Sequence, residues 1–200
     1  MHLRTIHPPY AALWLSALLT FKMFAGQSTT NTPTLLLEDY SDPKRNKNGV
    51  DRLLIDDKSA GSKSTATVQC EKGILSAQGN LEPGRGVPAF ISLVSLLSSD
   101  GKPKDLSNFQ GVRLRVKITK GILCVQVAST EIQNFDFHTS SPITTKRGEF
   151  QEIRILFKDL KRAWSEQTKL PLTSITSVNL VSFSTAKDSF SYEVDELGFY

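Results

Sequence analysis

The sequence predicts an all-β sandwich built as one domain, and three observations lead to this fold class. Apolar residues recur at every second position through most of the chain after residue 34, which is typical of half-buried strands. Turn signals separate these segments at intervals of about eight to twelve residues. Only one segment has the spacing of a helix. Many short strands with regularly spaced turns indicate a sandwich or a barrel.

The expected strands follow one another closely along the chain. Lys72-Gly73 and Lys120-Gly121 each separate two of them as turns, and Lys72-Gly73 is typical of a β-hairpin turn. Loops are expected at residues 42–51 and at the Pro- and Gly-rich residues 81–88. The predicted strands cover residues 35–39, 64–71, 74–79, 89–97, 112–119, 122–129, 132–138, 149–157, 177–185 and 189–199.

Residues 157–167 are the one helical candidate. Phe157, Leu160 and Trp164 recur there at helical spacing, which predicts a short helix that crosses one end of the sandwich. At this spacing Trp164 is expected in the core, although an exposed tryptophan could also serve as a platform for a sugar ring.

The N-terminal part of the chain differs from the rest. Residues 1–37 contain no Asp or Glu, and residues 11–21 form an unbroken run of apolar and small residues. This run is shorter than the roughly 20 residues of a membrane span but fits the apolar region of a secretory signal. We expect residues 1–26 to be a signal peptide or an N-terminal anchor, residues 27–34 a linker, and residues 35–200 the folded domain.

The leader also predicts where the protein works. An export signal implies a periplasmic or extracellular location, and a mitochondrial presequence is the alternative, because acid-poor leaders occur there too. Membrane contact is expected only through an N-terminal segment that is not cleaved.

Composition and charge are those of a globular protein that does not bind nucleic acid. Hydrophobic residues make up 39% of the chain and charged residues 22%, with a formal net charge of +4. Basic and acidic residues are interleaved rather than gathered into a basic stripe, which excludes nucleic acid as the expected partner.

The two cysteines are expected to remain free thiols. Cys70 shares a strand face with Ala66 and Val68, which should be the inner face. Cys124 alternates with the apolar residues beside it and should point outward. An inward and an outward cysteine are poorly placed to form a disulfide.

The sequence contains no familiar catalytic signature. It lacks a G-x-S-x-G nucleophile elbow, an H-E-x-x-H zinc motif and a glycine-rich phosphate loop. Of three histidines, His2 and His7 lie in the leader, which leaves His138 alone in the domain. We therefore expect a protein that is not an enzyme. A carboxylate-based glycoside hydrolase is a remaining alternative, and it would need two facing acids about 5 to 9 Å apart in a cleft.

The candidate ligand-binding residues lie on two predicted strands. If residues 132–138 form a strand, then Asn134, Asp136 and His138 share its outer face and the intervening phenylalanines face the core. Such a polar ladder could bond sugar hydroxyls or a peptide backbone. Arg113 and Arg115 share the outer face of another strand and could lie beside Asp136. On this hypothesis, Asp136→Ala abolishes binding and leaves the melting temperature nearly unchanged.

No cofactor is expected, with one qualification for a structural calcium ion. Glu38 and Asp195 lie in the first and last predicted strands, which pair in many sandwiches, and carboxylate oxygens are ligands that calcium prefers. The two residues could therefore hold an ion together with backbone carbonyl groups.

Four segments resemble the domain of the complex I intermediate-associated protein 30 family, and the resemblance spans the predicted domain. They read LLIDDKSAGSKSTATVQ at residues 53–69, KDLSNFQGVRLRVK at 104–117, FQEIRILFKDL at 150–160 and FSYEVDELGFY at 190–200. The second segment is the most specific. The chain departs from the family pattern at Ala60-Gly61-Ser62, where the family commonly has Met-Gly-Gly.

The resemblance implies a galactose-binding-like jelly roll, a fold shared with carbohydrate-binding modules. It also implies that mitochondrial members assist the assembly of a membrane complex through protein contacts. We therefore expect a non-catalytic module that docks a protein partner or a glycan on a sheet face. An assembly or chaperone factor for a membrane complex is the alternative.

Overall fold

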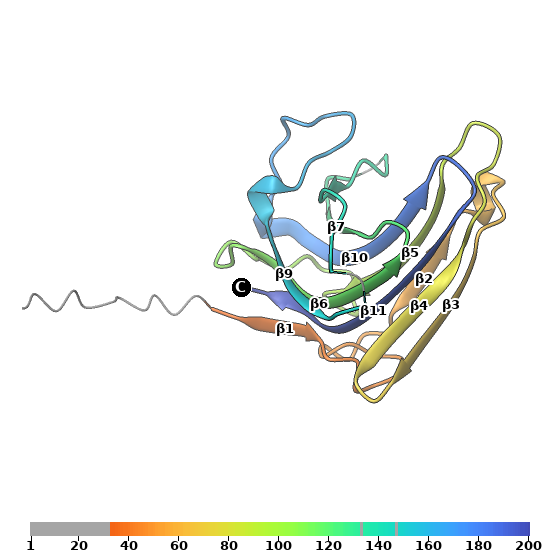
Figure 1. Ribbon diagram of the computed structural model, residues 1–200. Coiled ribbons are helices and arrows are strands. Elements are labelled where there is room, and N and C mark those ends of the chain that lie inside the picture. Colours follow the sequence, from red (N-terminus) through yellow and green to blue (C-terminus); the bar gives the residue numbers. More distant parts are fainter. Residues whose placement is uncertain (1–32, 133, 147) are drawn as a thin grey trace, which may run out of the picture. The chain divides into compact units, whose positions relative to one another are not determined.

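The computed structural model describes residues 33–132, 134–146 and 148–200, and these form a two-layer antiparallel sandwich (Figure 1). One sheet has the order β3-β4-β11-β6-β9, with β1 also paired to β11, and the other has the order β2-β5-β10-β7-β8. The strands are β1 (Leu35–Glu38), β2 (Leu53–Asp56), β3 (Thr65–Glu71), β4 (Ile74–Leu81), β5 (Ala89–Leu96), β6 (Gly111–Lys120), β7 (Cys124–Ser129), β8 (His138–Thr139), β9 (Gln151–Leu156), β10 (Ile175–Ser184) and β11 (Asp188–Phe199). The predicted leader and most of the predicted linker lie outside the described residues.

The core fills the space between the two sheets, as the period of two predicts. On β6, Val112, Leu114 and Val116 are fully buried, and the intervening Arg113 and Arg115 point away from the core. The same alternation supplies the rest of the core from the facing strands. Its largest fully buried apolar side chains include Leu75, Leu81, Leu180, Phe190, Leu197 and Phe199.

Both predicted turns form, but only the first closes a hairpin, because β6 and β7 lie in different sheets. Lys72 and Gly73 join β3 to β4 with φ values of 54° and 77°, the left-handed conformation that a tight hairpin turn requires. Gly121 follows β6 with a φ of 72°, and a Cβ atom there would lie 2.6 Å from the backbone oxygen of Ser189. Glycine is therefore required at this turn for its conformation and for the close approach of β11.

The structure corrects the prediction of a strand over residues 132–138. Only His138–Thr139 is a strand, because the backbone before it turns. The Asn134 side chain accepts a bond from the backbone N–H of Asp136, and the N–H of Phe137 donates to the carbonyl of Phe135. Phe135 has a φ of 61°, which reverses the chain locally. The turn that the Asn134 side chain stabilises therefore interrupts the strand that the alternating pattern predicts.

The predicted helix over residues 157–167 is reduced to a short 3-10 turn, η2 (Phe157–Asp159). Beyond it the chain is extended at Leu160, and Lys161 exchanges two backbone hydrogen bonds with Thr139, at 2.8 and 3.0 Å. This bridge to the edge of the sheet competes with helical hydrogen bonds. The other 3-10 turns are η1 (Lys58–Ala60) and η3 (Leu172–Ser174).

Three further features of the fold bear on the predictions. Cys70 and Cys124 are free thiols, as expected, although Cys124 is buried rather than exposed, and its burial raises its pKa to about 11. Among the described residues, no helix is long and apolar enough to cross a membrane. β2 was not predicted, because Leu53, Leu54 and Ile55 are consecutive apolar residues without alternation.

Candidate functional site

The structure separates the five predicted ligand-binding residues into two groups. Asn134, Asp136 and His138 lie in the segment that leads into β8, at one end of the sandwich. Arg113 and Arg115 lie on the outer face of β6, where they contact acidic residues of neighbouring strands. Among the described ion pairs, neither Arg113 nor Arg115 contacts Asp136, so the structure does not gather the five residues into one cluster.

Asp136 does not line an outer face but is buried, with 3% of its surface exposed. Its carboxylate accepts hydrogen bonds from the backbone N–H of Ala163 at 2.7 Å, from the N–H of Trp164 at 3.3 Å and from the Ser165 hydroxyl at 2.9 Å. Burial alone would raise the pKa of the Asp136 carboxyl, but the bonds from Ser165, Ala163 and Trp164 outweigh burial and lower the pKa. The carboxylate therefore fastens residues 134–136 to residues 163–165.

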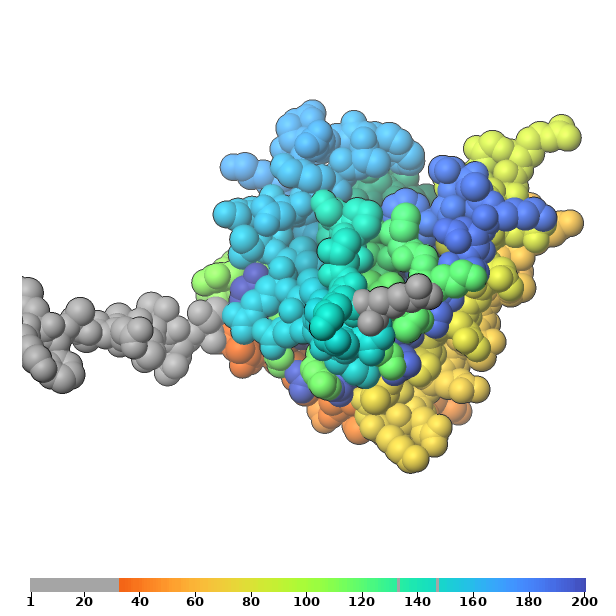
Figure 2. All heavy atoms as spheres, in the orientation of Figure 1, coloured from red at the N-terminus to blue at the C-terminus, as the bar shows by residue number. Residues whose placement is uncertain are grey.

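This fastening holds two exposed aromatic side chains on the joined loops. Phe135, predicted to face the core, is 82% exposed, and Trp164, predicted to pack in the core, is 74% exposed. Phe135 directly precedes Asp136, and Trp164 bonds to the Asp136 carboxylate through its own backbone N–H. Figure 1 places both loops at the same end of the sandwich, and Figure 2 shows the segment after η2, in light blue, standing out there.

The exposure of this pair is unusual for the molecule. Aromatic side chains normally bury most of their surface, and a left-handed backbone at a bulky residue such as Phe135 is energetically unfavourable unless its surroundings enforce it. Here the Asp136 bonds enforce it. We call Phe135 and Trp164 the aromatic pair. Sequence reasoning selected the residue that holds the pair and named Trp164 as a possible sugar platform. The assumed strand placed Phe135 inside, and the assumed helix favoured the core for Trp164.

His138 is fully buried beneath the same loops. Its Nε2 lies 3.0 Å from the carbonyl oxygen of Thr168, to which it donates when the ring is neutral, and its Nδ1 has no partner among the described residues. Burial lowers the pKa of His138 below its ordinary value of 6.5, and the neighbouring Arg162 acts in the same direction. Glu131 and Asp136 oppose this decrease, as does the bond to Thr168.

Acidification is therefore expected to destabilise the fold through His138. The unfolded chain binds a proton near pH 6.5 while the folded chain does not, so stability is complete above that pH and is lost as the pH falls below it. The free energy of unfolding, measured by denaturant titration between about pH 7.5 and pH 5, should fall more in the wild type than in His138→Gln. Parallel pH profiles of the two proteins would contradict this assignment.

Arg113 and Arg115 belong to a set of ion pairs on the outer face of the six-stranded sheet. Arg113 lies 3.0 Å from Glu196 and 3.7 Å from Glu152, and Arg115 pairs with Asp195. These contacts pair both arginines with acidic residues of the same sheet. Exposed pairs of this kind contribute little to stability, so the set explains solubility and strand alignment more readily than ligand binding.

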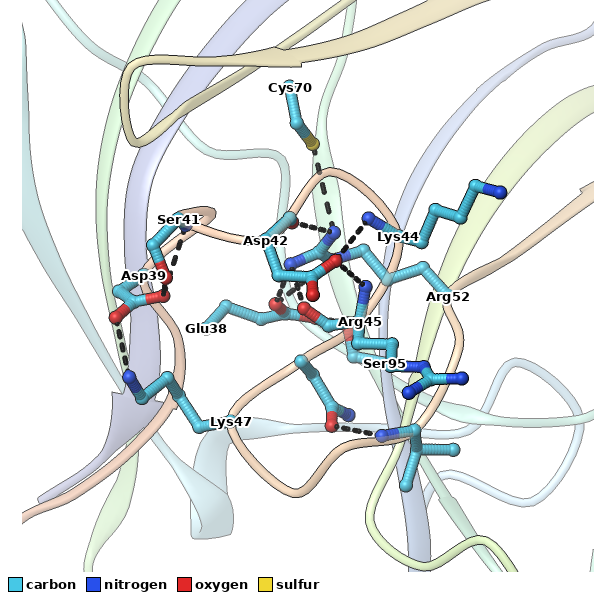
Figure 3. Close-up of polar contacts among 12 residues, drawn as sticks. Glu38, Asp39, Ser41, Asp42, Lys44, Arg45, Lys47, Arg52, Cys70 and Ser95 are labelled. Carbon is cyan, nitrogen blue, oxygen red and sulfur yellow. Dashed lines mark hydrogen bonds and ion pairs between the residues drawn. The ribbon is translucent and has the colours of Figure 1, made fainter.

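Glu38 and Asp195 do not come together, which corrects the predicted calcium site. Asp195 points outward to Arg115, whereas Glu38 is completely buried between the sheets. There Glu38 accepts bonds from Arg52 Nε and Nη2 at 2.9 and 2.8 Å and from the Ser95 hydroxyl at 2.5 Å (Figure 3). In the described part of the chain, no three His, Cys, Asp or Glu side chains gather as metal ligands would.

Next to the ion pairs, the same sheet carries a face of polar, mostly uncharged side chains that the sequence analysis did not select. Two adjoining hollows of about 400 and 220 Å³ lie over this face, along the strands coloured yellow in Figure 2. The strict alternation of polar and apolar side chains in β3 and β4 could have indicated this polar face. The polar face consists of Thr65, Thr67 and Gln69 of β3, Ser76, Gln78 and Asn80 of β4, and Ser189, Ser191 and Glu193 of β11.

The fold defines the class of the protein: an all-β jelly roll of the kind found in carbohydrate-binding modules. Residues 43–194 match the family described as Complex I intermediate-associated protein 30 (CIA30), and the chain belongs to this family. Both the fold and the family agree with the resemblance seen in the sequence. No curated protein matches the chain.

Two solved structures illustrate the similarity of fold. The family 11 carbohydrate-binding module of the cellulosomal cellulase Lic26A-Cel5E of Clostridium thermocellum superposes with a TM-score of 0.61 at 14% identity, covering 84% of this chain and 94% of the module. A family 11 module from the same organism, in complex with a β-1,3-1,4-mixed-linked tetrasaccharide, gives a TM-score of 0.58 at 14% identity over 83% and 94% of the two chains. At this identity the likeness concerns the fold.

Proposed function

We propose that the protein is a non-catalytic binding domain that holds a glycan against the aromatic pair. The observation that carries this proposal is the presentation of Phe135 and Trp164, both more than 70% exposed, on two loops fastened together by one buried carboxylate. Most other large apolar side chains of the domain are buried. Two fully presented aromatic rings are therefore the kind of exposed apolar surface that marks a binding site.

Exposed aromatic rings suit a sugar ligand for a physical reason. One face of a pyranose ring carries C–H groups, which pack against an aromatic face while the hydroxyl groups at the ring edge remain free to bond. Asn134, Glu166 and Gln167 are exposed beside the aromatic pair and can supply such bonds. Because the two loops are already joined through Asp136, little conformational entropy is lost when the ligand binds.

The comparisons support this proposal without deciding it. A module of similar fold binds a mixed-linked tetrasaccharide, and a glycan ligand fits the exported location that the leader predicts. The glycoside hydrolase alternative receives no support from the described outer face of the six-stranded sheet, where Glu152, Glu193, Asp195 and Glu196 each contact a lysine or arginine.

Removing either aromatic ring should weaken glycan binding without unfolding the domain. We expect Trp164→Ala and Phe135→Ala each to raise the dissociation constant about tenfold or more, a loss of about 1.4 kcal/mol or more. Isothermal titration calorimetry with the mixed-linked tetrasaccharide, followed by other glycans of a screening array, measures this effect. The melting temperature should change little, because both side chains are exposed.

Two control variants locate the site in the same experiment. Ile122→Ala removes an exposed aliphatic side chain elsewhere and should bind like the wild type. Gln78→Ala removes the centre of the polar face, which would bind the glycan if the sheet face were the site. Binding that is lost in Gln78→Ala and kept in Trp164→Ala would contradict the proposal.

A protein partner is the second candidate, and membership of the family favours it. The family is described as associated with an intermediate of complex I, and Trp and Phe anchors are common at the centres of protein interfaces. On this alternative, the aromatic pair docks on a subunit during assembly of a membrane complex. Capture of a partner from a membrane fraction by the wild type, but not by Trp164→Ala, together with an empty glycan screen, would favour it.

A further inference from the structure

β2 presents a second apolar surface, distant in sequence from the aromatic pair. Leu53, Leu54 and Ile55 are 43%, 48% and 47% exposed, although they are consecutive residues of one strand. β2 ends the five-stranded sheet and pairs only with β5. The strand therefore offers backbone hydrogen-bonding groups and apolar side chains along the same free edge.

The other terminal strands are protected against such pairing. β3 directs Thr67 and Gln69 outward, β9 carries Glu152 and Arg154, and β8 is only two residues long. Short, charged or polar edges are the usual means by which sandwiches avoid joining edge to edge. β2 lacks this protection.

A groove of about 270 Å³ opens beside β2, toward β3. Leu54 lies on the inner side of β2, opposite Leu93, and lines this groove together with the core residues Leu75 and Leu93. Leu53 and Ile55 lie on the other side of the strand, opposite Val94 and Ser92. The edge of the sandwich is thus open at β2, with core side chains forming the wall of the groove.

The strand is self-complementary in the antiparallel direction. If two copies pair with Leu54 opposite Leu54, then Leu53 of each copy faces Ile55 of the other, and the two grooves meet across the pair. In this register Asp56 of each copy, which pairs with Lys58 of its own chain, lies opposite Arg52 of the other, which stays paired with Glu38. The apolar centre of the strand therefore matches between two copies, and the ends bring no unpaired like charges together.

We propose that β2 pairs with β2 of a second copy about a twofold axis at Leu54, joining the two five-stranded sheets into one continuous sheet. The pairing covers the exposed leucines and closes the groove in both copies. It leaves the aromatic pair outside the paired strands, so the dimer carries two sites, and its existence is independent of what those sites bind.

Sedimentation analysis of the domain tests this proposal. The unit Thr32–Tyr200 contains both sheets and the complete core, so it can be produced without the leader. Its weight-average mass should rise from monomer to dimer as the concentration increases from micromolar to millimolar. Leu53→Lys/Ile55→Lys places lysines opposite one another and should weaken the dimer about tenfold or more. Ile122→Lys, at an exposed site away from β2, should not.

A cross-link tests the register directly. In a Cys70→Ser background, Leu54→Cys should form a disulfide between copies under mild oxidation, because directly opposed residues lie close enough to bridge. A domain that stays monomeric at every concentration would overturn the proposal. So would a dimer whose mass is unchanged by Leu53→Lys/Ile55→Lys.

Discussion

Replacing Arg52 by methionine is expected to lower the free energy of unfolding by about 3–5 kcal/mol, the largest effect we foresee for a residue outside the apolar core. The side chains of Arg52 and Glu38 are 5% and 0% exposed, so the substitution leaves the buried Glu38 carboxylate with the Ser95 hydroxyl as its one hydrogen-bond partner among the described residues. Arg52 also donates to the backbone carbonyls of Asp42 and Arg45, and these bonds are lost as well. Equilibrium unfolding in urea measures the change.

A double-mutant cycle separates the buried charge from the lost packing. Glu38→Leu/Arg52→Met removes both charges, and we expect this double variant to be more stable than Arg52→Met alone. The reason is that a buried carboxylate without its partner destabilises the fold more than an apolar side chain at the same position. If Arg52→Met lost less than about 1 kcal/mol, or if the double variant lost as much as the two single variants together, the buried pair would not have the structural role described here.

Asp136→Ala should have the second largest effect, on stability and on binding together. The carboxylate accepts bonds from residues 163–165, and one hydrogen bond to a charged group contributes about 1.5–3 kcal/mol, so a loss of at least that size is expected. The loops would separate, Phe135 would leave its left-handed conformation, and glycan affinity should fall although Asp136 touches no ligand. The sequence alone led to the opposite expectation of an unchanged melting temperature.

The pH dependence of Asp136→Ala provides its control. The pKa of Asp136 is lowered in the folded state, so its contribution is complete above about pH 3.9, the value of an unfolded aspartate, and is lost as the pH falls below it. The difference in unfolding free energy between wild type and Asp136→Ala should therefore shrink below that pH. Asp136→Asn, which keeps one acceptor oxygen, should be affected less than the alanine variant at neutral pH.

The strands could be predicted because their sequences alternate, and the segments that could not be predicted follow other rules. Residues 112–119 alternate cleanly, and the strand there extends the prediction by only one residue at each end. Residues 132–138 also alternate, but the Asn134 side chain and the backbone of Phe135 turn the chain. β2 has no alternation because its edge position exposes both of its faces.

The candidate site shows the same limit. Asp136 was selected for its chemistry, yet its partners at residues 163–165 lie 27 to 29 positions away in the sequence, and no local pattern indicates that contact. Without this contact, the alternation placed Phe135 inside and helical spacing placed Trp164 inside. Exposure of an aromatic side chain depends on tertiary contacts of this kind.

Tryptophan fluorescence of the domain Thr32–Tyr200 tests the proposed function most directly. The chain contains two tryptophans, and because Trp14 lies outside this domain, Trp164 is the only one that the domain retains. Titration with the mixed-linked tetrasaccharide, or with a glycan found by screening, should change the emission of Trp164 saturably, with the same dissociation constant as calorimetry. A glycan that binds by calorimetry and leaves the Trp164 emission unchanged would place the site elsewhere and contradict the account.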